Sequence, residues 1–266
     1  TVTTTRLRGV EAAPEADTVP LGRRRRWRED AGEAVLFAAG FVSILTTGAI
    51  VVVLGKDALH FFRNPDVSLV DFLTGTVWQP QLGKFGLLPL LNATLMVSGI
   101  AMVVALPIGL SIAVYLSEYA TPAVRNRLKP TLEILAGVPT VIYGYFALTF
   151  VTPILRWALG ARTVDIYNVL SAGLVVGILV IPLVASMSED ALQAVPRALR
   201  EAAYGLGATR LETSLQVVVP SALSGIAAAF MLAMSRAIGE TMVVAIAAGA
   251  GPRLTANPLR SAETMT

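Results

Sequence analysis

The sequence contains no cysteine and only one histidine among its 266 residues. Without cysteine the chain has no disulfide framework, no thiolate nucleophile and no thiolate metal site, and one histidine cannot build a histidine metal cluster. Charge is scarce as well. Only 15% of the residues are charged, whereas about a quarter is usual for a soluble domain. The composition therefore argues against a soluble protein and against thiol or histidine-metal chemistry.

Hydrophobic residues, in contrast, make up 55% of the chain, and the mean hydropathy is +0.67. They are concentrated in five long stretches that contain almost no charge: 34–55, 85–117, 134–155, 166–188 and 213–252. A bilayer core requires about 20 apolar residues of α-helix, so each stretch is long enough to cross the membrane once. We therefore predict an all-α fold, a polytopic transmembrane helical bundle.

Basic residues predict the orientation of this bundle. An arginine-rich run, 23–28, precedes the first stretch as in a signal peptide. The uncharged run is too long for an ordinary signal peptide, however, and no clear cleavage site follows. With the N-terminus in the cytoplasm, most lysines and arginines lie on the cytoplasmic side, as the positive-inside rule requires. Topology thus explains the pI near 9.4 better than nucleic-acid binding does.

The same features divide the chain into parts. Residues 1–33 lack an apolar period and are predicted to be a disordered, basic cytoplasmic tail. Residues 34–55 form the first transmembrane helix, and residues 56–84 an external loop. Residues 85–266 form the helical core, which contains a cytoplasmic loop at about 189–220. Proline occurs inside three of the spans, at Pro107, Pro139 and Pro182, and each predicts a kink.

The cytoplasmic loop has an apolar period of three or four residues. It is formed by Leu192, Val195, Leu199, Ala202, Ala203 and Leu206. The period predicts an amphipathic helix with one apolar face, ended by Gly205 and Gly207 and followed by a second helix. Such an apolar face packs either against the bilayer surface or in a groove of a cytoplasmic partner.

Specific residues of this loop resemble a known motif. Glu201, Ala202 and Ala203 are followed by Gly207 and Pro220 at the spacing of the EAA motif of ABC importer permeases. A second EAA triplet, at 11–13, lacks the later glycine and proline, so the triplet alone is not the signal. The two alanines keep the helix thin, Gly207 permits a sharp turn, and Glu201 can accept a charge-assisted hydrogen bond. The resemblance implies that the loop docks on a nucleotide-binding subunit and transmits its closure.

The chain has no phosphate-binding loop of its own. Its Gly-Lys pairs, at 55–56 and 83–84, lack the remainder of the Walker A pattern. The resemblance therefore implies that ATP and Mg are bound by a partner ATPase. We expect no cofactor, metal or catalytic residue on this chain, which would be a transport subunit rather than an enzyme.

Two charged residues, Arg236 and Glu240, interrupt the fifth stretch. A charge at the centre of a membrane helix costs about 3 kcal/mol, so such residues are retained where they pair or face a polar path. Four residues apart, they share one helical face and can form an ion pair. Two interpretations remain open: a structural ion pair, or a charged lining for a solute path.

A narrower resemblance comes from three segments: RAIGETM at 236–242, the segment 88–119 and the segment 133–148. They resemble the phosphate ABC importer permeases of the PstC type, whose core is MetI-like. The resemblance implies that Arg236 and Glu240 take part in phosphate movement, and the planar fork of arginine suits phosphate oxygens. Such permeases usually have a further helix. We therefore expect that five spans are present, that a sixth is missing, and that the polar residues 253–266 lie outside.

Together these features predict a permease subunit of an ATP-driven phosphate importer in the bacterial cytoplasmic (inner) membrane. The implied partners are a second permease subunit, a cytoplasmic ATPase dimer, an external phosphate-binding protein, phosphate and the lipid bilayer, with no nucleic acid. Alternatives are the sister permease of the same complex and a sulfate- or molybdate-type permease. A secondary transporter or channel that uses Arg236 and Glu240 belongs to another class, as does a non-transporting scaffold, and the complete EAA spacing favours the ABC importer.

Overall fold

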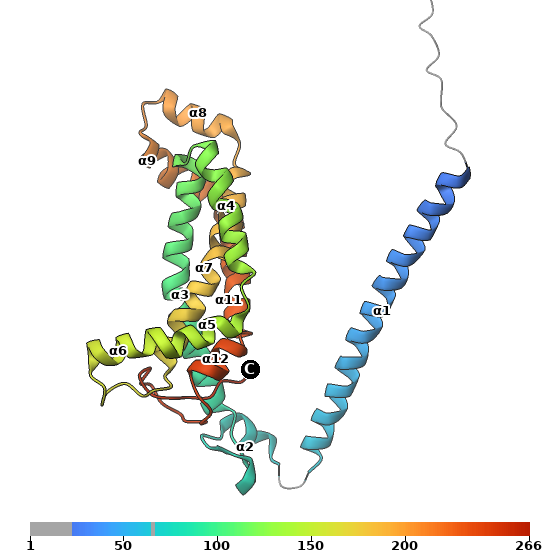
Figure 1. The fold of residues 1–266 in the computed structure, drawn as a ribbon, viewed down its shortest axis with the longest axis vertical. Helices are drawn as coiled ribbons and strands as arrows, with labels where there is room; N and C mark the ends of the chain where they lie inside the picture. The colour runs from blue at the N-terminus through green and yellow to red at the C-terminus, as the bar shows by residue number, and fades with distance from the viewer. Residues whose placement is uncertain (1–22, 65–66) are drawn as a thin grey trace, which may run out of the picture. The chain divides into compact units, whose positions relative to one another are not determined.

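The computed structural model describes residues 23–64 and 67–266. It divides the chain into two units, Thr1–Asn64 and Pro65–Thr266, which are considered separately. Figure 1 shows that the described residues are mostly helical. Four of their helices are long and apolar enough to cross a membrane, and a bent pair makes a fifth if it counts as one span. The predicted all-α membrane class is confirmed.

The first unit contains one helix, α1 (Arg23–Phe62), whose apolar part is exposed along its whole length. The predicted span 34–55 lies inside this helix. The prediction of a disordered tail over residues 1–33 is wrong for residues 23–33, which are helical, and its remainder lies outside the described residues. Arginine, glutamate and alanine favour helix before the apolar run begins. For the same reason the helix continues past residue 55 into the predicted external loop.

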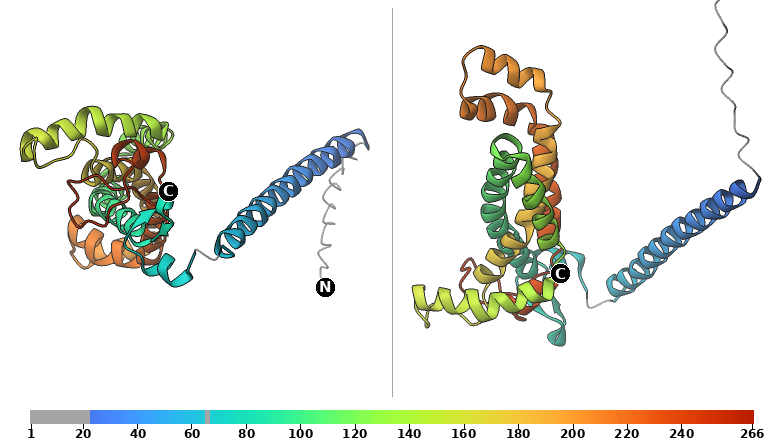
Figure 2. Two further views of the ribbon diagram at one scale, coloured as in Figure 1. Left: turned by 90° about the horizontal axis from the view of Figure 1, so that it is seen from below. Right: turned by 45° about the horizontal axis from the view of Figure 1, so that its top comes forward.

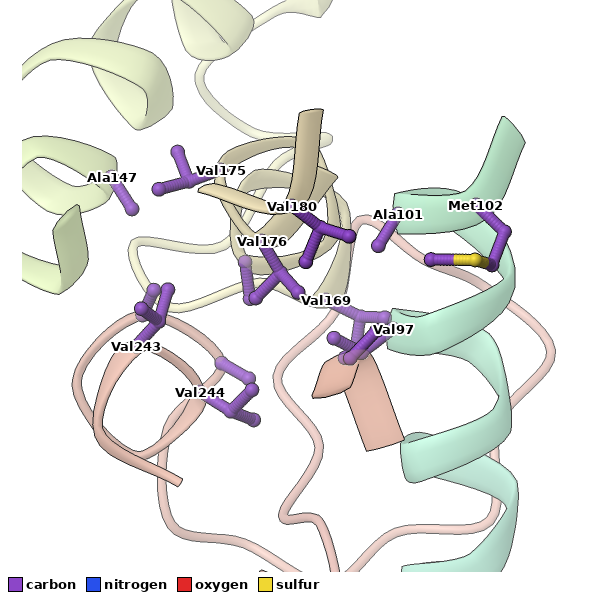
Figure 3. Close-up of a cluster of buried hydrophobic side chains, with 14 of the residues drawn as sticks. Val97, Ala101, Met102, Ala147, Val169, Val175, Val176, Val180, Val243 and Val244 are labelled. Carbon is purple, nitrogen blue, oxygen red and sulfur yellow. The ribbon is translucent and has the colours of Figure 1, made fainter. Parts of the chain in front are cut away.

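The second unit is built on α3 (Leu88–Val114) and α7 (Val169–Gln193), which pack along each other (Figure 1). A π-helical turn, η2 (Tyr115–Tyr119), extends α3. The helix α11 (Leu223–Ile238) packs against both. Figure 3 shows the valine-rich core between these elements and α12 (Met242–Ala247), in which Val97, Val176 and Val243 are at most 1% exposed.

Small residues permit the close approach of α3 and α7. A Cβ atom added at Gly109 of α3 would lie 2.7 Å from the Cβ of Val184 on α7. At Gly173 of α7 it would lie 2.8 Å from the Cβ of Ile100 on α3. Both distances are shorter than real Cβ contacts allow, so glycine is required for this packing.

Gly109→Ala is therefore expected to destabilise the protein by about 1–3 kcal/mol, the usual cost of overpacking. The control is Gly99→Ala on the same helix, where an added Cβ has no neighbour within 4 Å. Both changes alter helix propensity equally, so the difference between their melting temperatures in detergent reports the helix contact. Equal melting temperatures for the two variants would contradict the prediction.

The third apolar stretch, predicted as a span at 134–155, is divided between two helical segments, and the second, Thr140–Leu159, is one of the four candidate spans. The helix α4 (Pro122–Ala136) ends within the stretch, and α5 (Thr140–Phe146) begins after Pro139. The π-helical turn η3 (Ala147–Val151) and α6 (Thr152–Leu159) continue α5. Figures 1 and 2 show α4 running along α7, and α5 with α6 running across it. Proline lacks an N–H and disfavours helical geometry in the residue before it, so Pro139 produces a complete break rather than a kink.

The fifth stretch, 213–252, is also discontinuous. It begins with the π-helical turn η4 (Thr213–Val218) and the short helix α10 (Val219–Ser221). A bend of 72° at Ala222 precedes α11. A second break, 239–241, separates α11 from α12. The break that follows α11 contains Glu240, so one of the two charges of this stretch lies in non-helical chain.

Short elements lie at the lower end of this unit in the view of Figure 1. The helix α2 (Leu69–Thr74) precedes an antiparallel hairpin in which β1 (Trp78–Gln79) pairs with β2 (Lys84–Phe85) around η1 (Pro80–Leu82). The final segment, 249–266, packs against the start of α7, where Leu170 N–H donates to Pro258 O at 2.8 Å. Part of this polar segment is therefore buried, and Ala262 is fully so.

Candidate functional site

Arg236 and Glu240 form the ion pair that their spacing predicted. The distance from Arg236 Nη1 to Glu240 Oε2 is 2.8 Å. Arg236 lies in the last turn of α11, and Glu240 follows the helix end at Gly239. Their burial differs greatly, because the Glu240 side chain is 2% exposed and that of Arg236 is 45% exposed. The carboxylate is thus held inside the bundle, while the guanidinium keeps donors free toward the surface.

The exposed part of Arg236 lines an open recess of about 440 Å³ between α7 and α11. The other lining residues are Leu183, Leu232, Ser235 and Gly239. Arginine is the only charged side chain among them. An arginine in an apolar recess attracts anions more strongly than one in bulk water, because the apolar walls lower the local dielectric constant.

The buried side of the pair contacts the end of the chain, a contact that sequence reasoning missed. Thr266 Oγ1 donates to the backbone oxygen of Glu240 at 3.1 Å. Met265 N–H donates to Thr94 Oγ1 on α3 at 3.0 Å. Residues 265–266 therefore connect α3 to the break after α11. Only the polarity of this segment was visible in the sequence, and polarity alone does not predict a return into the bundle.

Several polar side chains of α3 have hydrogen-bond partners within the structure. Thr94 donates to Leu90 O, and Ser98 to Thr94 O, both within α3. Asn92 donates to Thr255 O at 2.7 Å and so fixes the final segment. These contacts satisfy the donors of the three side chains within the structure, and Thr94 and Ser98 are buried, at 6% and 5% exposure.

The helix, glycine turn and second helix predicted for the loop at 189–220 are present. The helix α8 (Arg197–Gly205) carries the EAA residues, of which Glu201 and Ala202 are exposed and Ala203 is buried. Gly207 has a φ of 86°, a left-handed conformation that favours glycine. A capping box then starts α9 (Arg210–Glu212), with Thr209 and Glu212 bonding to each other's backbone N–H groups.

The single apolar face predicted for this loop is wrong. Leu192 belongs to α7 and Val195 to the turn after it, and both are buried there. Pro196 then separates them from α8, because proline stops the helix. The later members of the pattern remain on the surface, with Leu199 42% and Leu206 91% exposed. These exposed leucines leave an apolar surface beside the EAA residues.

A second charged cluster joins α4 to the end of α7. Glu189 is completely buried and lies 2.7 Å from both Arg125 and Lys129. Lys129 also contacts Asp190 at 2.5 Å. Burial lowers the pKa of Lys129, but hydrogen bonds to Asp190 and Glu189 and the charges of both outweigh it, and the pKa is raised above 10.5. In the sequence Arg125 and Lys129 counted only as topology signals. An acidic residue directly after an apolar run was the available hint.

With this geometry established, comparison with known proteins defines the class. Residues 105–265 match the family of binding-protein-dependent transport system inner membrane components. The match covers more than half of the chain, so the protein belongs to this family. It is a membrane-spanning permease subunit of an ABC importer. Family membership implies a partnership with an ATPase and a substrate-binding protein.

Three relatives are similar to this chain over most of its length. A probable ABC transporter permease, YqgH from Bacillus subtilis, is 32% identical over 92% of this chain and 79% of its own length. The phosphate transport system permease PstC from Mesorhizobium japonicum is 30% identical over 82% and 73%. PstC from Xylella fastidiosa is 33% identical over 86% and 74%. Among solved structures, the inward-facing MetNI methionine ABC transporter aligns with 62% of this chain and 74% of its own, at 23% identity and a TM-score of 0.46.

Proposed function

We propose that this chain is the PstC-type permease subunit of an ATP-driven phosphate importer. The observation that carries the proposal is the half-exposed Arg236 in an apolar recess, held from its buried side by Glu240. The relatives named PstC, at 30% and 33% identity, support phosphate as the solute. The secondary-transporter alternative is not favoured by membership of a binding-protein-dependent family.

In this proposal Arg236 contacts the phosphate and Glu240 regulates how tightly it does so. The guanidinium presents several N–H donors in a planar fork that matches two phosphate oxygens. Glu240 occupies one of these donors at 2.8 Å and offsets the positive charge. The remaining donors attract the anion without trapping it, because a transport site must release its solute as readily as it binds it.

Coupling to ATP hydrolysis takes place at the loop of Glu201, Ala202, Ala203 and Gly207. The exposed Glu201 accepts a hydrogen bond from the ATPase, and the exposed leucines beside it enter an apolar groove of that partner. ATP and Mg are bound by the ATPase dimer, and this chain holds no cofactor. A second permease subunit completes the path, an external protein delivers phosphate, and the N-terminus of this chain lies in the cytoplasm.

The proposal is tested by phosphate uptake in vesicles that contain this chain, its sister permease and the ATPase, with the binding protein outside. Radiolabelled phosphate is expected to enter only with ATP. A tenfold excess of unlabelled phosphate should compete, and the same excess of sulfate or molybdate should not. Uptake that continues without the ATPase would support a secondary transporter, and competition by sulfate or molybdate would support those permease types.

Glu201→Lys is expected to reduce ATPase binding to the permease by about tenfold, because it replaces an acceptor by a like charge at a contact with basic groups. Copurification of the ATPase with the permease measures the effect. Glu133→Lys is the control, since Glu133 is also an exposed glutamate but lies on α4, outside the loop. Equal ATPase retention by wild type and Glu201→Lys would exclude Glu201 from the docking surface.

A further inference from the structure

One residue of α8, Arg200, is largely buried against the helical bundle. Its side chain is 16% exposed, whereas its neighbour Glu201, which lines the same pocket, is exposed. Arg200 Nη2 lies 2.9 Å from Glu118 Oε1, and Arg200 Nε lies 3.3 Å from both carboxylate oxygens. Two N–H groups of one guanidinium therefore engage one carboxylate, the geometry in which arginine binds most specifically.

The same guanidinium also bonds to the end of α7. Arg200 Nη1 donates to Val195 O at 2.7 Å, and Nη2 donates to Leu192 O at 2.8 Å. The last carbonyls of a helix have no partners within it and carry partial negative charge, so a buried arginine is well suited to bind them. Arg200 thus serves as a cap for the helix that ends just before α8.

Glu118 belongs to the end of the other central helix. It lies in η2, which extends α3, and its side chain is 6% exposed. Ser117 Oγ donates a further hydrogen bond to Glu118 Oε1 at 2.9 Å. The carboxylate is therefore fixed on α3 before Arg200 reaches it. One side chain of α8 consequently connects this helix to the ends of both α3 and α7.

Apart from the three-residue connection to α7, α8 packs mainly on η4, and the side-chain hydrogen bonds of α8 to these two ends are those of Arg200. Ala203 is the only buried residue of α8. Beneath the helix lies a cavity of about 470 Å³, whose lining includes Glu118, Arg197, Arg200, Glu201 and Tyr204. The pocket leaves little direct packing between α8 and η2, so specific bonds join the two. Arg200 makes those bonds.

We propose that the Arg200–Glu118 pair, together with the bonds of Arg200 to the α7 carbonyls, transmits the movement of α8 to α3 and α7. Arg200 is a positioning residue that contacts neither phosphate nor nucleotide. The inference rests on the proposed ATPase docking at Glu201 and adds to it the connection between docking site and bundle. Loss of Arg200 then uncouples hydrolysis from transport and leaves docking intact.

The test uses the reconstituted importer described above and measures phosphate transported per ATP hydrolysed. Arg200→Gln is expected to keep the ATPase bound and hydrolysing, while transport per ATP falls by about tenfold or more, since charge-assisted hydrogen bonds are lost. Arg200→Lys should recover only part of the coupling, because a single ammonium cannot engage the carboxylate and both carbonyls in the same geometry. Arg197→Gln is the control: Arg197 lies on the same helix and cavity wall, is exposed, and has no hydrogen bond in the described residues.

Glu118→Gln provides an independent second variant, which removes the charge from the opposite side of the pair with almost no change of volume. It should reproduce the uncoupling seen with Arg200→Gln. Wild-type coupling in both variants would overturn the inference while leaving the proposed function intact. Loss of the bound ATPase would assign Arg200 to docking and would also overturn it. If both variants lower the melting temperature until the complex is lost, the pair serves folding instead. Absence of ATP-dependent uptake in the wild type would overturn the proposed function itself.

Discussion

Arg236→Ala is expected to reduce phosphate uptake by about a hundredfold or more. Each charge-assisted hydrogen bond contributes about 1.5–3 kcal/mol, and the arginine fork offers two to one phosphate. Initial rates of radiolabelled phosphate uptake in the reconstituted importer measure the loss. Arg236→Lys should retain part of the activity, because the charge remains but the planar fork is lost.

Loss of phosphate uptake by Arg236→Ala has a second, structural explanation, which further variants distinguish from loss of phosphate binding. Arg236→Ala leaves Glu240 buried, at 2% exposure, without its ion-pair partner. The double variant Arg236→Ala/Glu240→Ala removes both charges and should assemble normally, yet still fail to transport. Glu240→Gln frees Arg236 to hold the anion more tightly, so KM and the maximal rate should both fall. Wild-type uptake by either alanine variant would show that the ion pair is only structural.

Removing both cations from Glu189 is expected to have the largest effect on stability. Glu189 is 0% exposed, and Arg125 and Lys129 each lie 2.7 Å from its carboxylate. Arg125→Ala/Lys129→Ala leaves the buried carboxylate with a hydrogen bond from Gln193 but without an ion-pair partner, which costs about 3–5 kcal/mol. Thermal unfolding of the purified subunit in detergent measures this as a lower melting temperature. Above pH 10.5 the contribution of Lys129 should disappear as the pH rises through its raised pKa.

Two further variants test whether the loss of stability comes from the buried charge of Glu189. Arg127→Ala removes an exposed arginine of the same helix, which forms no ion pair in the described residues, and should change the melting temperature little. Adding Glu189→Leu to the double variant should recover most of the stability, because it eliminates the uncompensated buried charge. A double variant that melts like the Arg127→Ala control would contradict the prediction.

Features that depend on residues close together in the sequence were predicted correctly. The uncharged runs predicted α3 and α7 because hydropathy is a property of the segment itself. The Arg236–Glu240 pair and the Gly207 turn were predicted because each depends on residues a few positions apart. The predicted shared helical face was wrong, however, because Glu240 follows the end of α11. The transport role of that pair is still a prediction that the uptake experiments test.

Features that depend on distant residues were not predicted. The cluster around Glu189 joins α4 to α7 across 64 and 60 positions of sequence. Arg200 meets Glu118 across 82 positions. Nothing in either segment alone indicates its partner. Pro139 was recognised as a disruption of the third stretch, but only the packing of α5 across the bundle showed that the disruption is a complete break (Figure 1).

The two breaks around α11 have a mechanical consequence. The helix is bounded by the bend at Ala222 and by the non-helical residues from Gly239 to Thr241. The helix can therefore move as a rigid body between two hinges. It can tilt by changes of backbone angles at these hinges, without breaking a hydrogen bond inside the helix. Arg236 lies in the last turn of α11, where a given tilt about Ala222 moves a side chain furthest.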